Sequence, residues 1–298
     1  MYSIKSLFTG LTNPHAAYRE IQRVYNRRIK GRQGIDVMSE DWDTLFILDA
    51  CRFDLFQETN EISGELESKI SKGSSTGEFL RNNFLNEKYN DTIYISANPH
   101  VLNYNIDKKF YDRARLWEDE WNEELRTVLP ERVAERSIKV FRNNPNKRLI
   151  IHFIQPHYPF IGEIGREIEH GSMTGAGAIA DERDYATIWE KLSDNKVEKQ
   201  VVWDAYRENL ELVLPQVENI IHEVGGKCII SSDHGNALGE QGVYGHPGGV
   251  YIQELVEVPW LTVETGSRRE IISESKHRHE GNQQTEKMEE RLSHLGYV

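Results

Sequence analysis

Three short apolar stretches of the sequence end in side chains of metal-binding types. Each runs directly into a carboxylate, an imidazole or both, in Leu48-Asp49-Ala50-Cys51-Arg52, Gln155-Pro156-His157 and Ser231-Ser232-Asp233-His234-Gly235. A carboxylate beside an imidazole suits a divalent cation of the zinc or manganese type. A single ending of this kind is often only a helix cap or a solvated loop. Three of them together predict a metal site that the stretches share.

A glycine-flanked cluster of hydroxyl side chains could supply a nucleophile. The segment Lys72-Gly73-Ser74-Ser75-Thr76-Gly77 leads into an apolar stretch with helical spacing. The simplest interpretation is a helix N-cap, for which Thr76 is well suited. The same arrangement aims a hydroxyl and the positive end of a helix at one point, where a phosphate or sulfate would bind. A metal ion at that point would lower the pKa of the hydroxyl.

A sheet whose strands end at one edge would bring these side chains together. Short apolar stretches predict strands at residues 45–48, 93–96, 149–154, 228–232 and 258–263. Helical spacing predicts helices at residues 77–84, 130–142 and about 196–224. Strands that alternate with helices predict an α/β fold, with a central, mostly parallel sheet flanked by helices on both faces. In such sheets the chemistry gathers at the carboxyl ends of the strands.

The composition limits the classes of function. The chain has 298 residues, 38% of them hydrophobic and 10% aromatic, so a folded core is expected. Its two cysteines, Cys51 and Cys228, cannot build a disulfide scaffold and fit a reducing compartment. The sequence contains no apolar run near the ~20 residues of a membrane span and no apolar signal-peptide centre. We therefore expect a cytoplasmic protein, and its oligomeric state stays open.

The net charge of −12 is unevenly distributed. It argues against nucleic acid as a partner, because binding phosphates needs a basic surface. Residues 1–32 carry +6, so residues 33–298 carry −18. Apolar residues recur every three or four positions from Tyr18 to Ile29, which predicts an amphipathic basic helix. We favour packing of its apolar stripe on the main domain, and peripheral contact with an anionic membrane or an acidic partner is the alternative.

Several motifs resemble those of the alkaline phosphatase superfamily. The first metal motif of its nucleotide pyrophosphatase/phosphodiesterase form is similar to Asp49-Ala50-Cys51-Arg52-Phe53-Asp54-Leu55. The closing motif of the sulfatases resembles Ser232-Asp233-His234-Gly235, followed by Leu238-Gly239-Glu240, Tyr244-Gly245-His246 and Val258-Pro259. Their Asp-Pro-His-x-Pro-Phe element is similar to Gln155-Pro156-His157-Tyr158-Pro159-Phe160. The matches follow the order of the family over about residues 43–263.

This resemblance implies a metal centre with histidines beside it. Asp49, Asp233 and His234 would bind at least one divalent metal ion, namely zinc, manganese or calcium. His157 and His246 would face the substrate as ligands or leaving-group acids, or join a second metal. The alternative for these two is that they are loop histidines bonded to the backbone.

The resemblance also points to the nucleophile, which would be the fourth metal ligand. In the family the nucleophile stands two positions before a proline or its equivalent, near the start of a helix. Gly77 occupies that place here, which indicates Ser75. Thr76 is the alternative, and Ser74 is the third choice.

Other residues match the family with structural roles. Arg52 would pack against Asp54, although contact with a bound anion is the alternative. Tyr206 and Asn209 resemble residues of a structural helix of the family. The matches define an alkaline phosphatase-like catalytic domain at residues 35–266, between a basic N-terminal helical segment at 1–34 and a charged C-terminal helix or tail at 267–298. Within the domain, the glycine-rich residues 161–185 predict an active-site insert or flap.

Departures from the family narrow the expected reaction. The sulfatase pattern Cys/Ser-x-Pro-x-Arg is absent, so Cys51 is not assigned as a nucleophile. Ala50 replaces the second sulfatase aspartate, and Pro247 replaces the lysine expected after His246. We therefore expect a metal-dependent, sulfatase-like hydrolase or phosphotransferase that acts on phosphoric esters. The alternatives are a sulfuric ester hydrolase (a sulfatase) and a catalytically silent anion-binding scaffold; the substrate would be a small-molecule, glycan-linked or lipid-linked ester.

Overall fold

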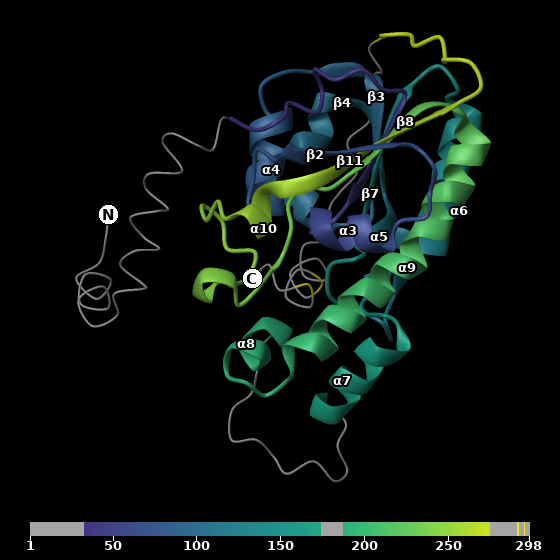
Figure 1. The fold of residues 1–298 in the computed structure, drawn as a ribbon. Coiled ribbons are helices and arrows are strands. Elements are labelled where there is room, and N and C mark those ends of the chain that lie inside the picture. The colour runs from purple at the N-terminus through teal and green to yellow at the C-terminus, as the bar shows by residue number, and fades with distance from the viewer. Residues whose placement is uncertain (1–32, 174–186, 275–290, 292–294, 296–298) are drawn as a thin grey trace.

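A seven-stranded mixed sheet organises the protein, in the order β2-β11-β8-β1-β7-β3-β4 (Figure 1). The computed structural model describes residues 33–173, 187–274, 291 and 295. The strands of the sheet are β1 (Thr44–Leu48), β2 (Glu65–Ile70), β3 (Tyr89–Ser96), β4 (Phe110–Arg115), β7 (Arg148–Phe153), β8 (Gly226–Ser231) and β11 (Glu257–Thr265). β11 runs antiparallel to both of its neighbours, whereas the other pairings are parallel.

Strand β1 lies at the centre of the sheet and sets its carboxyl edge. All five of its side chains are buried, as expected for a continuous apolar run in a parallel sheet. Its register pairs Leu48 with Phe153 of β7 and Ile47 with Ser231 of β8. The residues that follow these three strands therefore emerge side by side at one edge of the sheet.

Helices cover both faces of the sheet, and Figure 1 shows α6 and α9 side by side along one face with α4 on the other. The helices are α3 (Phe53–Thr59), α4 (Thr76–Phe84), α5 (Leu116–Asp119), α6 (Pro130–Asn143), α7 (Glu163–Met173), α8 (Ile188–Ser193), α9 (Lys199–Val224) and α10 (Gln253–Val256). Connections contain the 3-10 helices η1 (Pro99–Tyr104), η2 (Ile106–Lys109) and η3 (Glu240–Gly242). Two hairpins pair β5 (Trp121–Asn122) with β6 (Thr127–Val128), and β9 (Ala237–Leu238) with β10 (Tyr244–Gly245).

The predicted α/β fold is confirmed. The five predicted strands correspond to β1, β3, β7, β8 and β11, and the three predicted helices to α4, α6 and α9. The sequence pattern did not predict β2 and β4, because these edge strands have mostly exposed or half-buried side chains and contain no apolar run. Part of the expected insert at 161–185 is helix α7, and residues 174–186 lie outside the described residues.

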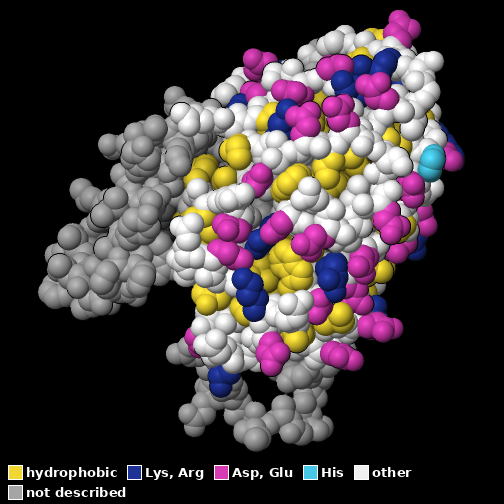
Figure 2. Space-filling view, viewed as in Figure 1, with side chains coloured by type: hydrophobic (Ala, Val, Ile, Leu, Met, Phe, Trp, Pro, Cys, Tyr) yellow, Lys and Arg dark blue, Asp and Glu magenta, His cyan; other side chains and the backbone are white. Residues whose placement is uncertain are grey.

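The three-part organisation of the chain stays a prediction. The predicted basic helix at 1–32 and most of the predicted C-terminal tail lie outside the described residues. Within the part that is described, no helix has both the length and the apolar character needed to cross a bilayer. Figure 2 shows acidic side chains spread over the visible face, with basic ones among them, rather than gathered in one patch.

The segment after β11 crosses the amino ends of the central strands. Arg268 donates to the buried carboxylate of Asp43 at 2.7 Å and to exposed Asp41 at 2.8 Å. The same Asp43 carboxylate accepts the backbone N–H of Lys227 at 2.8 Å. Gly226 permits this approach, because a Cβ there would lie 2.4 Å from Asp43 Oδ2. Asp43 therefore links the starts of β1 and β8 to the segment that follows β11.

We expect Asp43→Ala to lower the free energy of unfolding by about 2–3 kcal/mol, because it leaves the N–H of Lys227 and the Arg268 guanidinium without their buried acceptor. Urea unfolding would measure the change. Asp41→Ala is the matched control, and it should cost less than about 1 kcal/mol because that ion pair is exposed. Equal losses for the two variants would contradict this role of Asp43.

Candidate active site

Asp49 follows β1 and is fully buried. Its Oδ2 accepts a hydrogen bond from Asn98 Nδ2 at 2.5 Å and lies 3.5 Å from His152 Nε2. Burial alone would raise the pKa of Asp49, but the interaction with His152 and the neighbouring imidazoles hold it well below its usual range. Asp49 is therefore an ionised carboxylate in the interior, surrounded by groups that stabilise its negative charge.

Asp233 and His234 follow β8 and face Asp49. Asp233 Oδ1 accepts the N–H groups of Ala50 and His234, both at 3.0 Å. His234 Nδ1 lies 2.8 Å from the carbonyl of Gly235, which only a protonated Nδ1 can bind. The lone pair of a neutral His234 is then on Nε2, which lies 3.3 Å from Asp233 Oδ2 and 3.7 Å from Asp49 Oδ1.

Thr76 completes this group from the opposite side. It is the first residue of α4 and is fully buried, and its Oγ1 lies 3.1 Å from His234 Nε2. Ser75 is the N-cap, yet its side chain makes no capping hydrogen bond. Its Oγ lies instead beside Gly248, 3.3 Å from where a Cβ would stand. The structure therefore brings Thr76 directly against a predicted metal ligand and places Ser75 against the loop after His246.

Glu78 explains why the sequence Ser75-x-x-Glu78 does not form a capping box. A capping box would direct Glu78 to the N–H of the N-cap residue. Here Glu78 Oε2 accepts from Ser74 Oγ at 3.1 Å and from Tyr251 Oη at 3.1 Å. Ser74 in turn accepts the N–H of Val250 at 3.2 Å. Ser74, the third choice for the nucleophile, thus joins the start of α4 to the loop after His246.

The donor set fits a divalent metal ion. Two carboxylates and a hydroxyl lie around the imidazole of His234. The ligand atoms of a tetrahedral zinc lie about 3.3 Å apart at its usual bond lengths. The distances from His234 Nε2 to Thr76, Asp233 and Asp49 are 3.1, 3.3 and 3.7 Å. Asp233 Oδ2 is buried and has no hydrogen-bond partner among the described residues, as expected of an atom with room for a cation.

His152 is a second imidazole that can share the two carboxylates. One ligand atom from each of Asp49, His152 and Asp233 lies within 4.8 Å of the others. Tyr94 Oη fixes the other side of the ring, 2.8 Å from His152 Nδ1. The sequence reading overlooked His152, although the signal was present: it is the one polar residue inside the apolar stretch at 149–154.

His157 and His246 form a pair beside the carboxylates. Their Nε2 atoms are 2.8 Å apart, and the His246 ring centroid lies 4.6 Å from that of His234. His157 Nδ1 contacts the carbonyl of Tyr158, so His157 Nε2 accepts and His246 Nε2 donates when both rings are neutral. Burial lowers the pKa of both imidazoles, and for His246 the neighbouring histidines lower it further.

A fourth strand end, after β3, also supplies site residues that the sequence reading missed. Asn98 bonds Asp49, and His100 lies over the start of α4, where its Nε2 is 3.2 Å from the position of a Cβ on Gly77. Burial lowers the pKa of His100 to about 4. The segment Asn98-Pro99-His100 begins two positions after the end of β3, as Gln155-Pro156-His157 does after β7, and this shared pattern could have revealed it.

Helix α9 holds two loops of the site. Tyr206 Oη donates to the carbonyl of Ala50 and accepts the N–H of Arg52 at 3.2 Å. Asn209 Nδ2 donates to the carbonyls of Pro159 at 3.0 Å and His157 at 3.2 Å. Its Oδ1 accepts a further backbone N–H of this loop, that of Ile161, at 2.8 Å. The two side chains, three positions apart on one helix face, position the loops that carry Asp49 and His157.

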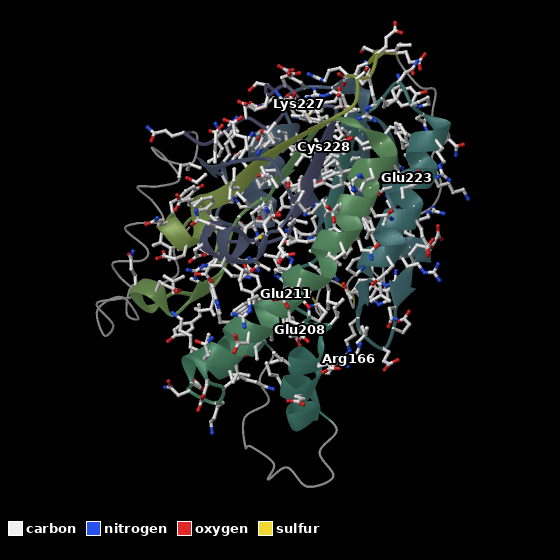
Figure 3. The ribbon with its side chains drawn as sticks, turned by 45° about the vertical axis from the view of Figure 1, so that its right-hand side comes forward. Arg166, Glu208, Glu211, Glu223, Lys227 and Cys228 are labelled. Carbon is white, nitrogen blue, oxygen red and sulfur yellow. The ribbon has the colours of Figure 1, made fainter. Side chains whose placement is uncertain are left out.

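Two further contacts support the same region. Arg52 packs against Asp54, with Nε 2.8 Å from Oδ1, as predicted, and also pairs with Glu240 at 3.1 Å. Next to Asn209, the Glu208 carboxylate accepts the first N–H groups of α7, at 2.8 Å from Glu163 and 3.0 Å from Ile164 (Figure 3). A carboxylate at a helix N-terminus stabilises the helix dipole, so α9 also fixes the start of α7.

No protein-family model matches the sequence, and no curated protein matches it. Several solved structures are similar to this chain. The soluble domain of lipooligosaccharide phosphoethanolamine transferase A from Neisseria meningitidis is 12% identical, with a TM-score of 0.48 over 74% of this chain and 75% of that one. The C-terminal periplasmic domain of phosphoethanolamine transferase EptC from Campylobacter jejuni is 14% identical, with a TM-score of 0.49 over 74% and 78%. The 2-O GAG sulfatase BT1596 is 11% identical, with a TM-score of 0.41 over 80% and 66%.

These enzymes belong to the alkaline phosphatase superfamily. It is the group that the sequence motifs resemble. All three TM-scores lie below 0.5. The expected cytoplasmic location stays a prediction.

We expect His234→Ala to weaken zinc binding by more than about 100-fold and His152→Ala by about 10–100-fold, because His234 lies beside three donors whereas His152 lies beside the two carboxylates only. Competition with a fluorescent zinc chelator would measure both affinities. Circular dichroism would verify that each variant is folded. Loss of zinc binding in His152→Ala with near-normal binding in His234→Ala would reverse the assignment.

We expect Asn209→Ala to lower the free energy of unfolding by about 2 kcal/mol, because it removes the bonds that hold the loop of His157. Zinc affinity should change little, since His157 is outside the proposed ligand set. Thermal unfolding and the chelator competition would measure the two effects. Glu211→Ala, an exposed position on the same helix, is the control and should stay within about 0.5 kcal/mol of the parent.

Proposed function

We propose that this protein is a metal-dependent enzyme that cleaves or transfers phosphoric esters, with Thr76 as its nucleophile. One observation carries the proposal. A buried hydroxyl at the start of a helix lies 3.1 Å from an imidazole that in turn faces two buried carboxylates at 3.3 and 3.7 Å. A hydroxyl in this setting is close to the metal ligands and to the positive end of α4.

Asp49, Asp233, His234 and Thr76 would hold the metal ion, and His152 lies close enough to both carboxylates to be a further ligand. When bound, a divalent ion lowers the pKa of a hydroxyl and neutralises charge on a phosphoryl oxygen. Zinc, manganese and calcium remain the candidates, and the mixed nitrogen and oxygen donors favour the first two.

The protein itself supplies the attacking group and an anion-binding helix end. Thr76 would lose its hydroxyl proton to solvent, and its Oγ1 would then form a bond to phosphorus while the bond from phosphorus to the ester oxygen breaks on the opposite side, which gives a phosphothreonine. The N-terminus of α4 would stabilise negative charge on the phosphoryl oxygens, because Thr76 is the first residue of that helix. Water, or an alcohol in a phosphotransferase, then takes the phosphoryl group from Thr76.

His246 and His157 would supply the proton for the leaving oxygen. In the neutral pair His246 carries its proton on Nε2 and shares it with His157 Nε2 at 2.8 Å. Burial lowers the pKa of both imidazoles, so both rings are neutral at pH 7, and a neutral imidazole is too weak an acid to protonate a leaving oxygen. The pair would therefore first take up a proton from solvent and then pass it to the leaving oxygen. The loop from Pro156 to Ile161, held by Asn209, fixes the orientation of His157.

A panel of aryl phosphate, bis-aryl phosphate and aryl sulfate tests the reaction class, with zinc, manganese and calcium added singly to the chelator-treated protein. We expect turnover of a phosphate ester that returns with one of these ions. Activity on sulfate alone would show a sulfuric ester hydrolase instead. Neither metal binding nor turnover of any ester would show a silent anion-binding scaffold.

We expect Thr76→Ala to lower kcat by at least about 1,000-fold and Ser75→Ala by less than about tenfold, because only the Thr76 hydroxyl faces the metal ligands. Thr76→Ser, which keeps the hydroxyl, should retain measurable turnover. Acid quenching followed by peptide mass spectrometry should locate the phosphoryl group on Thr76. A phosphorylated Ser75, with loss of activity in Ser75→Ala, would assign the nucleophile to Ser75 and leave the reaction class intact.

A further inference from the structure

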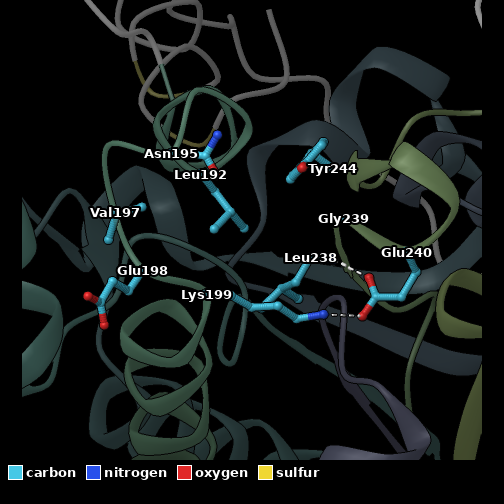
Figure 4. A pocket seen from close by; sticks show the side chains of 9 residues that line it. All are labelled: Leu192, Asn195, Val197, Glu198, Lys199, Leu238, Gly239, Glu240 and Tyr244. Atoms are coloured by element: carbon cyan, nitrogen blue, oxygen red, sulfur yellow. Dashed lines mark hydrogen bonds and ion pairs between the residues drawn. The ribbon is translucent and has the colours of Figure 1, made fainter.

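A cavity of about 500 Å³ opens between the start of α9 and the β9–β10 hairpin (Figure 4). It lies outside the metal centre, and the proposed mechanism uses none of its side chains. Its lining residues are Leu192, Asn195, Val197, Glu198, Lys199, Leu238, Gly239, Glu240 and Tyr244. A volume of this size falls within the range of about 300–1,000 Å³ that is typical of small-ligand sites.

The cavity shares its wall with the candidate active site. The β9–β10 hairpin connects His234 to His246, and it supplies Leu238 and Tyr244 to the cavity. Two residues of chain span at most about 7 Å, so Tyr244 of the cavity is adjacent to His246 of the site. Helix α8 packs against this hairpin, because ring atoms of Trp189 lie 3.2 Å from the position that a Cβ on Gly245 would occupy.

The lining is amphipathic. Buried Leu192 and Leu238, with the half-buried ring of Tyr244, form an apolar floor. The exposed side chains of Asn195 and Glu198 stand at the rim. A ligand with one apolar face and several polar groups at its edge matches this arrangement, because an aromatic or aliphatic floor binds the face and the amide and carboxylate bond the edge.

Charge selects against an anion in this cavity. The lining holds two carboxylates and one ammonium group, and the ammonium of Lys199 is bound to Glu240 at 3.0 Å. Glu240 also accepts the N–H of Leu238 at 2.5 Å and pairs with Arg52 at 3.1 Å. Burial alone would raise the pKa of Glu240, but these bonds lower it to about 2, so this acceptor is ionised at neutral pH. The phosphoryl group therefore belongs at the metal centre, and a neutral part of the substrate belongs here.

We infer that this cavity binds a neutral sugar ring, as the alcohol portion of the phosphate ester or of the acceptor. A sugar ring has an apolar face for Leu192, Leu238 and Tyr244, and hydroxyl groups that donate to Glu198 and bond to Asn195. An acyl chain would match the floor but would make no hydrogen bond at the polar rim. The inference rests on the proposed function for its place in the reaction, whereas sugar binding by itself does not.

Direct binding tests the site without catalysis. Glucose, galactose and N-acetylglucosamine, titrated into the full-length protein by calorimetry and saturation-transfer NMR, should include one that binds saturably. Leu192→Trp, which fills the floor, should weaken that binding by at least roughly tenfold. Asn195→Gly, which keeps the left-handed backbone at φ 57° and removes the amide, should weaken it by a smaller factor. Gln200→Ala, on α9 outside the cavity, should leave it unchanged.

Activity connects the cavity to the reaction. In Leu192→Trp, kcat/KM for the phosphate ester of the bound sugar should fall roughly tenfold, while kcat/KM for phenyl phosphate stays within about twofold of the parent. Thr76→Ala should still bind the sugar, so loss of catalysis and loss of the sugar site can be told apart. The inference is overturned if no sugar binds saturably, or if Asn195→Gly and folded Leu192→Trp both bind it as the parent does. An equal fall in kcat/KM for the sugar phosphate and for phenyl phosphate would also overturn the inference, because the substitution would then disturb the metal centre rather than sugar binding.

Discussion

Two buried carboxylates facing one another are the constraint on which the rest of the structure depends. Asp49 and Asp233 come from neighbouring strands and are both fully buried. Two like charges in a low-dielectric interior are unfavourable unless nearby cations or donors offset them. The surroundings supply donors one by one, from the N–H of Ala50 to the amide of Asn98. A bound cation would supply the rest of the positive charge that the two carboxylates require. A metal centre at the carboxyl edge of the sheet is therefore the simplest interpretation.

Helix α9 explains how loops on different strands keep a fixed geometry. A sheet fixes the point at which each strand ends but not the path that follows. Tyr206 and Asn209 bond the backbones of the loops after β1 and β7, and Glu208 bonds the start of α7. The loops contribute backbone N–H and C=O groups to these bonds, so they are held without using the side chains that do the chemistry.

The sequence predicted the parts of the fold and site that depend on local pattern. Apolar strands that end in Asp49, His157 and Asp233 can be recognised because period and polarity change abruptly there. The edge strands β2 and β4 could not, since their burial depends on neighbours distant in sequence. The preference for Thr76 over Ser75 also depends on tertiary structure. Adjacent hydroxyls have the same local pattern, and only the approach of His234 to one of them distinguishes the two.

The separation of Asp49 and Asp233 along the chain has a consequence for synthesis of the protein. The N–H of Ala50 bonds a carboxylate that lies 183 positions later, so a ribosome makes most of the sheet before the second acid exists. The central strand β1 likewise cannot pair until β7 and β8 have been synthesised, and pairings between strands so distant in sequence form slowly. In the nascent chain, Asp49 therefore has no second carboxylate beside it until Asp233 has been synthesised. We therefore expect closure of the carboxyl edge to be a late step of folding, and metal binding would stabilise the chain at that step.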